Sequence, residues 1–166
     1  MKTVAIVLSM IAAVLTTAAP ATSVSAASVR ECRNADLVAT YRSGGPAMNT
    51  LYGWIELRNV SQRSCTVRGY GGLSYVGHGD GSQVGSPAQR DPSTRVLTRL
   101  LEPGGRVRSR VAETSVAPYD AARCDPAAVD GFRVYVPDSR TSQYVARLST
   151  TCARTDLQML RHQAFT

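Results

Sequence analysis

The sequence predicts an all-β fold held by two disulfides, and three features of the chain lead to this expectation. Apolar and polar residues alternate with a period of two in many short segments. Clusters of Gly, Pro, Asn, Asp and Ser, which are poor strand formers, separate those segments. No stretch after residue 26 keeps apolar residues at the spacing of a helix. We expect a two-layer sandwich, which covers its sheets better than one open layer, with a barrel as the alternative.

Nine segments are expected to form the strands. In chain order they are residues 37–41, 52–60, 65–68, 73–77, 95–101, 106–113, 132–136, 143–148 and 157–161. Turn residues set limits in the same order: residues 43–46 follow the first segment, 79–82 the fourth, 103–105 the fifth and 137–139 the seventh. The Asp80-Gly81 step favours a hairpin, because glycine tolerates a positive φ.

Alternation assigns faces to three of these strands. In residues 52–60 it directs Gly53, Ile55 and Leu57 to the core. The opposite face of that strand carries Tyr52, Trp54, Glu56 and Arg58. In residues 106–113 the alternation places Arg106, Arg108 and Arg110 on the solvent face, about 7 Å apart. In residues 132–136 the alternation directs Phe132, Val134 and Val136 to the core.

Two interpretations of this polar surface stay open. The arginine row is either a solvated strand face that discourages edge-to-edge association or a stripe that contacts anions. Trp54 is a sugar or protein contact if its face meets solvent, and a core residue if a loop covers it. Partial burial of Trp54 is the expectation.

The first 26 residues have the layout of a cleavable signal peptide. Lys2 precedes an apolar run over residues 4–15, and small residues end in Val24-Ser25-Ala26. The run is shorter than the roughly 20 apolar residues of a membrane-spanning helix. The residues before Cys32 do not resemble those that precede a lipidated cysteine. We expect residues 1–26 to be removed and residues 27–166 to form one secreted domain without a transmembrane or lipid anchor.

Four cysteines follow this segment: Cys32, Cys65, Cys124 and Cys152. An even number of thiols in an oxidising compartment predicts two disulfides, for which three pairings exist. No metal site or cofactor is expected, since no C-x-x-C spacing occurs and the chain has two histidines.

The chain is basic, with a formal net charge of +7, and Lys2 is its lone lysine. Without the signal segment, 18 arginines would face 12 acidic residues, which gives +6. Such an arginine excess fits either the codon bias of a GC-rich gene or a preference for polyanions. For an exported bacterial protein we expect wall polymers or anionic lipid headgroups as partners before nucleic acid.

Residues 56–70, ELRNVSQRSCTVRGY, combine a strand end, an Asn-x-Ser turn, Cys65 and a Gly-Tyr step. This pattern resembles the centre of DUF4232, an actinobacterial family of exported domains of unknown function. The similarity continues through Cys32, LEPGG at residues 101–105, Cys124, FRVYVP at residues 132–137 and Cys152. The resemblance implies an immunoglobulin-like β-sandwich in the cell envelope or medium. It also implies that Cys32 pairs with Cys65 and Cys124 with Cys152, and it implies no activity.

Histidine, the usual general base near neutral pH, occurs twice. His78 shares residues 77–82 with Asp80 and Ser82, a composition typical of a hairpin turn. His162 lies in the last few residues, where fraying is common. None of the G-x-S-x-G, H-E-x-x-H or S-x-x-K motifs occurs, so no catalytic residue is assigned.

Two further polar motifs are expected to be structural. Asp120, Asp125 and Asp130 recur in a predicted loop without the spacing of a calcium-binding loop. The sequon at Asn59 is expected to be a strand-ending turn in which Asn59 tolerates left-handed backbone angles.

The sequence therefore predicts a secreted, non-catalytic binding module that contacts wall polymers or an envelope protein. Its expected binding surface consists of Trp54, Arg58, Arg106, Arg108 and Arg110. The alternative is a cryptic hydrolase in which His78, Asp80 and a serine converge, or an enzyme inhibitor that presents residues 85–93 as a rigid loop.

Overall fold

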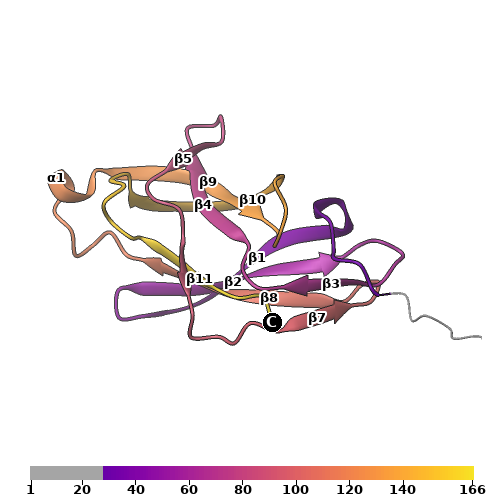
Figure 1. Cartoon of the computed structure of the whole chain (residues 1–166). Helices are drawn as coiled ribbons and strands as arrows, with labels where there is room; N and C mark the ends of the chain where they lie inside the picture. Colours follow the sequence, from indigo (N-terminus) through magenta and orange to yellow (C-terminus); the bar gives the residue numbers. More distant parts are fainter. Residues whose placement is uncertain (1–27) are drawn as a thin grey trace, which may run out of the picture.

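The computed structural model describes residues 28–166, and these residues form two main β-sheets that pack face to face (Figure 1). The elements are η1 Asn34–Asp36, β1 Leu37–Ala47, β2 Thr50–Asn59, β3 Cys65–Arg68, β4 Gly72–Gly77, β5 Ser82–Val84, β6 Gln89–Asp91, β7 Thr98–Leu101, β8 Arg106–Thr114, α1 Ala121–Cys124, β9 Pro126–Tyr135, β10 Ser142–Cys152 and β11 Leu160–Gln163. The predicted signal peptide, residues 1–26, lies outside the described residues.

One layer is a five-stranded sheet in the order β1-β2-β8-β11-β6, and the other is a four-stranded sheet in the order β10-β9-β4-β5. The four-stranded sheet is the upper layer in Figure 1. Strands β3 and β7 form a separate two-stranded sheet. Neighbouring strands run antiparallel except β6 and β11, which are parallel. The expected all-β sandwich is thus confirmed.

The core lies between the two layers and is built from alternate residues of their strands. From the five-stranded sheet, Ile55, Leu57 and Val107 contribute fully buried or nearly buried side chains. From the other sheet, Phe132 is fully buried, and its ring lies 5.2 Å from that of Tyr75. The faces that alternation assigned to residues 52–60, 106–113 and 132–136 are therefore correct.

Two disulfides join the pairs that the family resemblance implied. Cys32 is bonded to Cys65, which ties the segment before η1 to β3. Cys124 is bonded to Cys152, which ties α1 to the end of β10. The second cystine belongs to a small cluster of its own with Leu157 and Met159, separate from the main core.

The predicted turn at residues 43–46 is wrong, because these residues lie inside β1. A bulge between Ser43 and Pro46 absorbs them without ending the pairing with β2. Gly44 permits this, since a Cβ there would lie 2.6 Å from the Tyr52 carbonyl oxygen. The chain turns instead at Met48 and Asn49, which both have positive φ (43° and 62°), as a two-residue hairpin requires.

Strand limits also differ near the second disulfide. β9 begins at Pro126, so Asp130 lies in a strand rather than in the predicted loop. β10 continues to Cys152 because its second half also pairs with β9, past a register shift after Ala146. The last strand begins at Leu160, since residues 157–159 pack toward the Cys124–Cys152 cluster instead.

Three further segments depart from the expected pattern. β7 covers the second half of the predicted strand at residues 95–101. The short strands β5 and β6 were not predicted; β5 completes the hairpin that begins in β4, and β6 pairs with β11. No helix in the part of the chain from residue 28 onward is long and apolar enough to cross a membrane.

Candidate binding face on strands β1, β2 and β8

The outer face of β1, β2 and β8 brings together the five residues predicted as a binding surface. The register places Trp54 between Arg42 and Arg110. Four residues further along β2, Arg58 lies opposite Arg106. We call this surface the arginine face; it consists of Arg42, Tyr52, Trp54, Glu56, Arg58, Arg106, Arg108 and Arg110.

Arg42 is a member that the sequence did not reveal. The first strand was predicted to end at Tyr41, and the glycines that follow were interpreted as a turn. The regular register of β1 with β2 continues through Arg42, which pairs with Trp54, and the bulge follows after Ser43. Extending the predicted strand by one residue would have placed Arg42 on this face, because the two-residue alternation is unbroken there.

Glu56 lies at the centre of the arginine face and is 2% exposed. Its Oε2 lies 2.8 Å from Arg108 Nε, and this contact is a hydrogen bond. Two weaker ion pairs join Glu56 to Arg42 Nε at 3.5 Å and to Arg106 Nε at 3.6 Å. Burial acts to raise the pKa of Glu56, but the Arg108 hydrogen bond and the three positive charges outweigh it, so the net pKa is lowered.

The aromatic residues of the face contact its cations and its bulge. The Arg110 guanidinium carbon lies 4.0 Å from the centroid of the Tyr52 ring, a cation–π contact. The Trp54 ring packs on Gly44, where a Cβ would lie 2.9 Å from a ring carbon. Trp54 remains 37% exposed, in agreement with the expected partial burial. One aromatic surface therefore stays accessible among the arginines.

The charge of the face is only partly balanced. Arg58 and Arg106 are direct cross-strand neighbours, and like charges at such positions repel. Among the described ion pairs, neither Arg58 nor Arg110 has an acidic partner. Beside Arg110 the surface is hollowed by a depression of about 180 Å³, lined by Tyr52, Asp91, Ser93, Arg110, Ala112, Arg161 and Gln163. The face thus offers unpaired cations next to a concave site.

The predicted hairpin at His78 is confirmed as the connection between β4 and β5. His78 is exposed and has a φ of 62°, and the neighbouring Asp80 is also exposed. Asp80 Oδ1 accepts hydrogen bonds from the Ser82 backbone N–H at 2.8 Å and the Ser82 hydroxyl at 2.7 Å. These bonds close the turn, so Asp80 is occupied with Ser82 rather than with His78.

His162 does not fray; it lies in β11 and is 3% exposed. Its Nδ1 lies 3.3 Å from the hydroxyl of Ser109, which is also buried. The Ser109 hydroxyl donates its proton to the Gln163 carbonyl at 2.6 Å, so it is engaged with the backbone. Burial, followed by the positive charge of Arg90, lowers the pKa of His162 to about 4.

Residues 85–93 do not form a free rigid loop. Within them β6 pairs with β11, and the Ala88 N–H donates to the Leu73 carbonyl at 2.8 Å. The Ser86 hydroxyl donates to the Leu157 carbonyl. The segment is therefore bonded to both main sheets.

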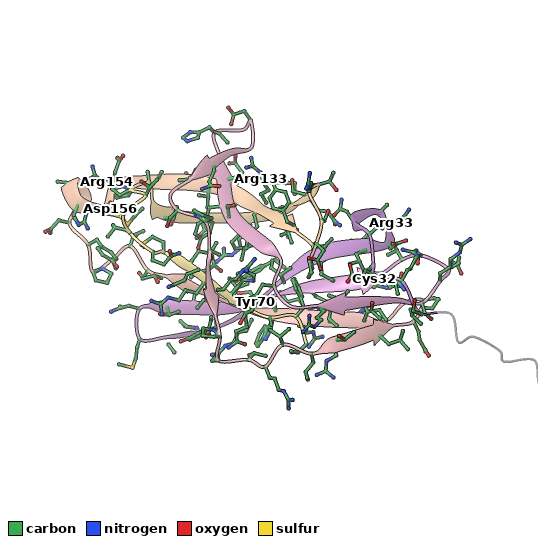
Figure 2. The ribbon with its side chains drawn as sticks, viewed as in Figure 1. Cys32, Arg33, Tyr70, Arg133, Arg154 and Asp156 are labelled. Atoms are coloured by element: carbon green, nitrogen blue, oxygen red, sulfur yellow. A yellow bond between two sulfur atoms is a disulfide. The ribbon has the colours of Figure 1, made fainter. Side chains whose placement is uncertain are left out.

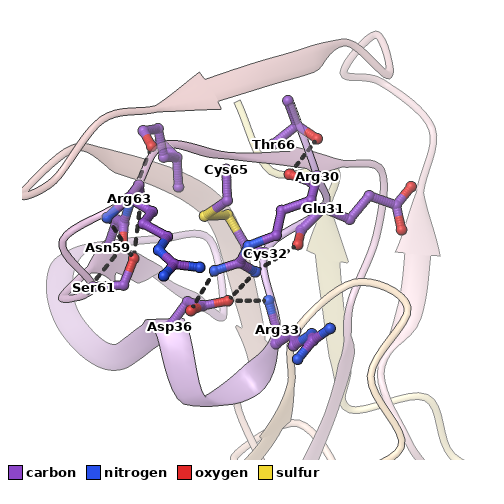
Figure 3. Close-up of polar contacts among 11 residues, drawn as sticks. Arg30, Glu31, Cys32, Arg33, Asp36, Asn59, Ser61, Arg63, Cys65 and Thr66 are labelled. Carbon is purple, nitrogen blue, oxygen red and sulfur yellow. Dashed lines mark hydrogen bonds and ion pairs between the residues drawn. A yellow bond between two sulfur atoms is a disulfide. The ribbon is translucent and has the colours of Figure 1, made fainter. Parts of the chain in front are cut away.

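The remaining acidic candidates occupy structural positions. Asp130 accepts the Gly79 N–H at the β4–β5 hairpin. Asp120 is the N-cap of α1 without a side-chain cap bond, and Asp125 is its C-cap with a φ of 51°. No group of three potential metal ligands occurs between residues 28 and 166. Asn59 has an ordinary φ, contrary to the left-handed prediction, and its side chain makes the turn by bonding Ser61 and the Arg63 carbonyl (Figure 3).

A second depression, of about 610 Å³, lies beside the Cys32–Cys65 disulfide. It is lined by Arg30, Glu31, Cys32, Arg33, Asn34, Ala35 and residues 138–141. Its Arg30 is already held by Asp36 at 2.7 Å, as Figure 3 shows. The hydrogen bond from Arg30 lowers the pKa of Asp36 to about 2. Its other two arginines, Arg33 and Arg140, have no acidic partner among the described ion pairs, and the depression carries three arginines where the arginine face carries five.

A buried polar network between the sheets was also missed. Glu113 accepts hydrogen bonds from Tyr41 at 2.6 Å and from Tyr75 at 3.0 Å, and Arg147 Nη2 lies 3.4 Å away. Burial, and then Glu113, raise the pKa of both tyrosines, so both hydroxyls keep the proton that they donate. Alternation from Val107 onward could have identified Glu113, because it places this carboxylate on the core face.

Comparison with known proteins gives one family. The family described as a domain of unknown function (DUF4232) matches residues 32–166, from the first cysteine onward. No curated protein and no solved structure matches the chain. The family match supports the resemblance seen in the cysteines and turns.

Proposed function

We propose, for a chain that belongs to the DUF4232 family of domains of unknown function, an exported, non-catalytic module whose arginine face binds anionic polymers of the actinobacterial cell envelope. The observation that carries the proposal is the arrangement of Arg42, Trp54 and Arg110 in one row beside the Arg58–Arg106 pair. Cations aligned on a flat sheet suit an extended polymer with repeated negative charges.

The chemistry of the face fits phosphate-bearing polymers. A guanidinium group can donate two parallel hydrogen bonds to one phosphate, which an ammonium group cannot do with the same geometry. Every basic side chain after Lys2, apart from the histidines, is an arginine. The accessible surface of Trp54 can stack on a sugar or polyol segment between two phosphates.

Export is supported by the two disulfides. Disulfides persist in oxidising compartments and are rare in the reducing cytosol. The intact mass of the protein recovered from culture medium should correspond to a chain that begins at Ala27. It should be lower than the mass of the fully reduced chain by four hydrogens, two for each disulfide. Recovery of the uncleaved chain would contradict export through the signal peptide, and recovery of a cleaved but reduced chain would contradict the disulfides in the exported protein.

Binding can be measured at the face itself, because Trp54 is the single tryptophan of the chain. Titration with a poly(glycerol phosphate) should change Trp54 fluorescence with saturation, whereas neutral dextran should not. The logarithm of the affinity should fall linearly with the logarithm of the salt concentration, because each phosphate contact releases counterions. Hydrolysis of the polymer during the titration would instead support the hydrolase alternative.

A pair of variants that remove the same number of charges tests whether the polymer binds at the arginine face. The triple variant Arg106→Ala, Arg108→Ala and Arg110→Ala should lower the salt slope by about 2 and abolish most binding. The control variant removes Arg33, Arg140 and Arg154, which are exposed in connecting segments outside the arginine face; Arg33 and Arg154 lie at opposite ends of the molecule (Figure 2). Equal loss in both variants would mean that net charge, and not the arginine face, determines binding.

A further inference from the structure

Glu56 is an acidic residue in the centre of the arginine face, whose other charged residues are all arginines. If the face acted through net charge alone, this carboxylate would weaken its attraction for a polyanion. The carboxylate is also 2% exposed, and burial of a charge is unfavourable unless partners compensate for it. Neutralisation of exposed arginines therefore does not explain why a buried carboxylate lies at this position.

The contacts of Glu56 share one geometric feature. Each of its three arginine partners approaches through Nε, the nitrogen nearest the side-chain stem. The terminal Nη atoms of Arg42, Arg106 and Arg108 make no hydrogen bond to any residue between 28 and 166. The same three side chains are 46% to 56% exposed. Glu56 thus holds the stems and leaves the terminal donors free.

The three partners come from both strands that flank β2. Arg42 lies on β1, while Arg106 and Arg108 lie on β8. Long side chains such as these lose rotamer freedom when they are ordered, and a ligand that must order them binds more weakly. A shared buried anchor would reduce this cost: Arg108 Nε is hydrogen-bonded to Glu56, and the Nε atoms of Arg42 and Arg106 lie 3.5 Å and 3.6 Å from it.

We propose that Glu56 is a positioning residue: it fixes the Nε ends of Arg42, Arg106 and Arg108 so that their Nη atoms form a preorganised receptor for phosphate groups of a linear polymer. The inference rests on the proposed function of the arginine face and identifies phosphate as the group that binds next to Glu56. Neighbouring strands lie about 4.8 Å apart and alternate residues about 7 Å apart, so the donors can contact successive phosphates.

The variant Glu56→Gln separates the two roles by the sign of its effect. It removes one negative charge, so a charge-only face would bind poly(glycerol phosphate) more tightly. A positioning role predicts weaker binding, by roughly fivefold or more, because the arginines lose their anchor. Glu56→Asp, which keeps the charge, should recover part of the affinity.

The matched control is Glu31→Gln, which removes the same charge from an exposed residue that has no described ion pair. It should leave binding unchanged or strengthen it slightly. Circular dichroism and the melting temperature establish that each variant is folded. Tighter or unchanged binding by folded Glu56→Gln would overturn the positioning role and leave the arginine face intact, whereas no binding by the wild type would overturn the proposed function.

A measurement on the wild-type protein keeps the inference testable if Glu56→Gln does not fold. In ¹⁵N-edited NMR spectra of the ligand-free protein, the Nε–H protons of Arg42, Arg106 and Arg108 should exchange with solvent more slowly than the Nε–H proton of Arg58. Arg58 lies on the same face without a described acidic partner, so it is an internal reference. Equal exchange at all four groups would show that no preorganised receptor exists.

Discussion

Replacement of Glu113 by alanine should destabilise the sandwich by about 3 to 5 kcal/mol, the range observed when one partner of a buried ion pair is removed. The carboxylate accepts bonds from Tyr41 and Tyr75 and lies 3.4 Å from Arg147. Arg147 Nε is buried without a partner already, so the variant would leave this cation without its carboxylate, with only the Leu148 carbonyl and the Tyr41 ring as partners. Tyr75, at 2% exposed, would lose its acceptor as well.

Urea unfolding at neutral pH, followed by Trp54 fluorescence and by circular dichroism, measures this loss. Because a domain of this size is stable by roughly 5 to 15 kcal/mol, the change should be large on that scale. The exposed Glu102 supplies a control, for which Glu102→Ala should change stability by less than about 0.5 kcal/mol.

A double variant tests the mechanism of this loss. If the unpaired Arg147 is responsible, Glu113→Leu combined with Arg147→Met should recover most of the stability lost in Glu113→Ala. A loss below about 1 kcal/mol in Glu113→Ala would refute the view that this network links the two sheets.

Two further changes have expected outcomes that follow from the same structure. Because the pKa of His162 is lowered from 6.5 to about 4, the unfolded chain binds a proton that the folded protein does not bind between these values. The free energy of unfolding should therefore be constant above about pH 6.5 and fall as the pH decreases toward 4. In the variant His162→Gln this decrease should be smaller by roughly 3 kcal/mol. Identical pH profiles of the wild type and the variant would exclude this role for His162. Conversion of Cys124 and Cys152 to serine opens a loop with a sequence separation of 28 residues and should cost roughly 3.5 kcal/mol in urea unfolding. A loss near zero for this variant would mean that the Leu157–Met159 cluster holds this end without the bond.

Much of the candidate site follows from alternation within single strands. Trp54 and Arg58 lie on one face of β2 and the three arginines of β8 on one face of that strand, as the two-residue period requires. The turn at His78 was equally visible, because Gly79 and Gly81 tolerate the positive φ that they adopt in this hairpin. Such features depend on residues close together in the chain.

The sequence by itself determined the all-β class and the inward and outward faces of the long strands, because the pleat of a strand makes side chains alternate without reference to any partner. The family resemblance added the cysteine pairing. The tertiary structure decided what the sequence could not show: the bulge after Ser43 that keeps β1 paired with β2 through the glycine pair, and the burial of Glu56 among three arginines. It also decided the meeting of Glu113 with Tyr75 across the core. These contacts join strands that are distant in sequence, and their register is fixed by packing between the sheets rather than by local pattern.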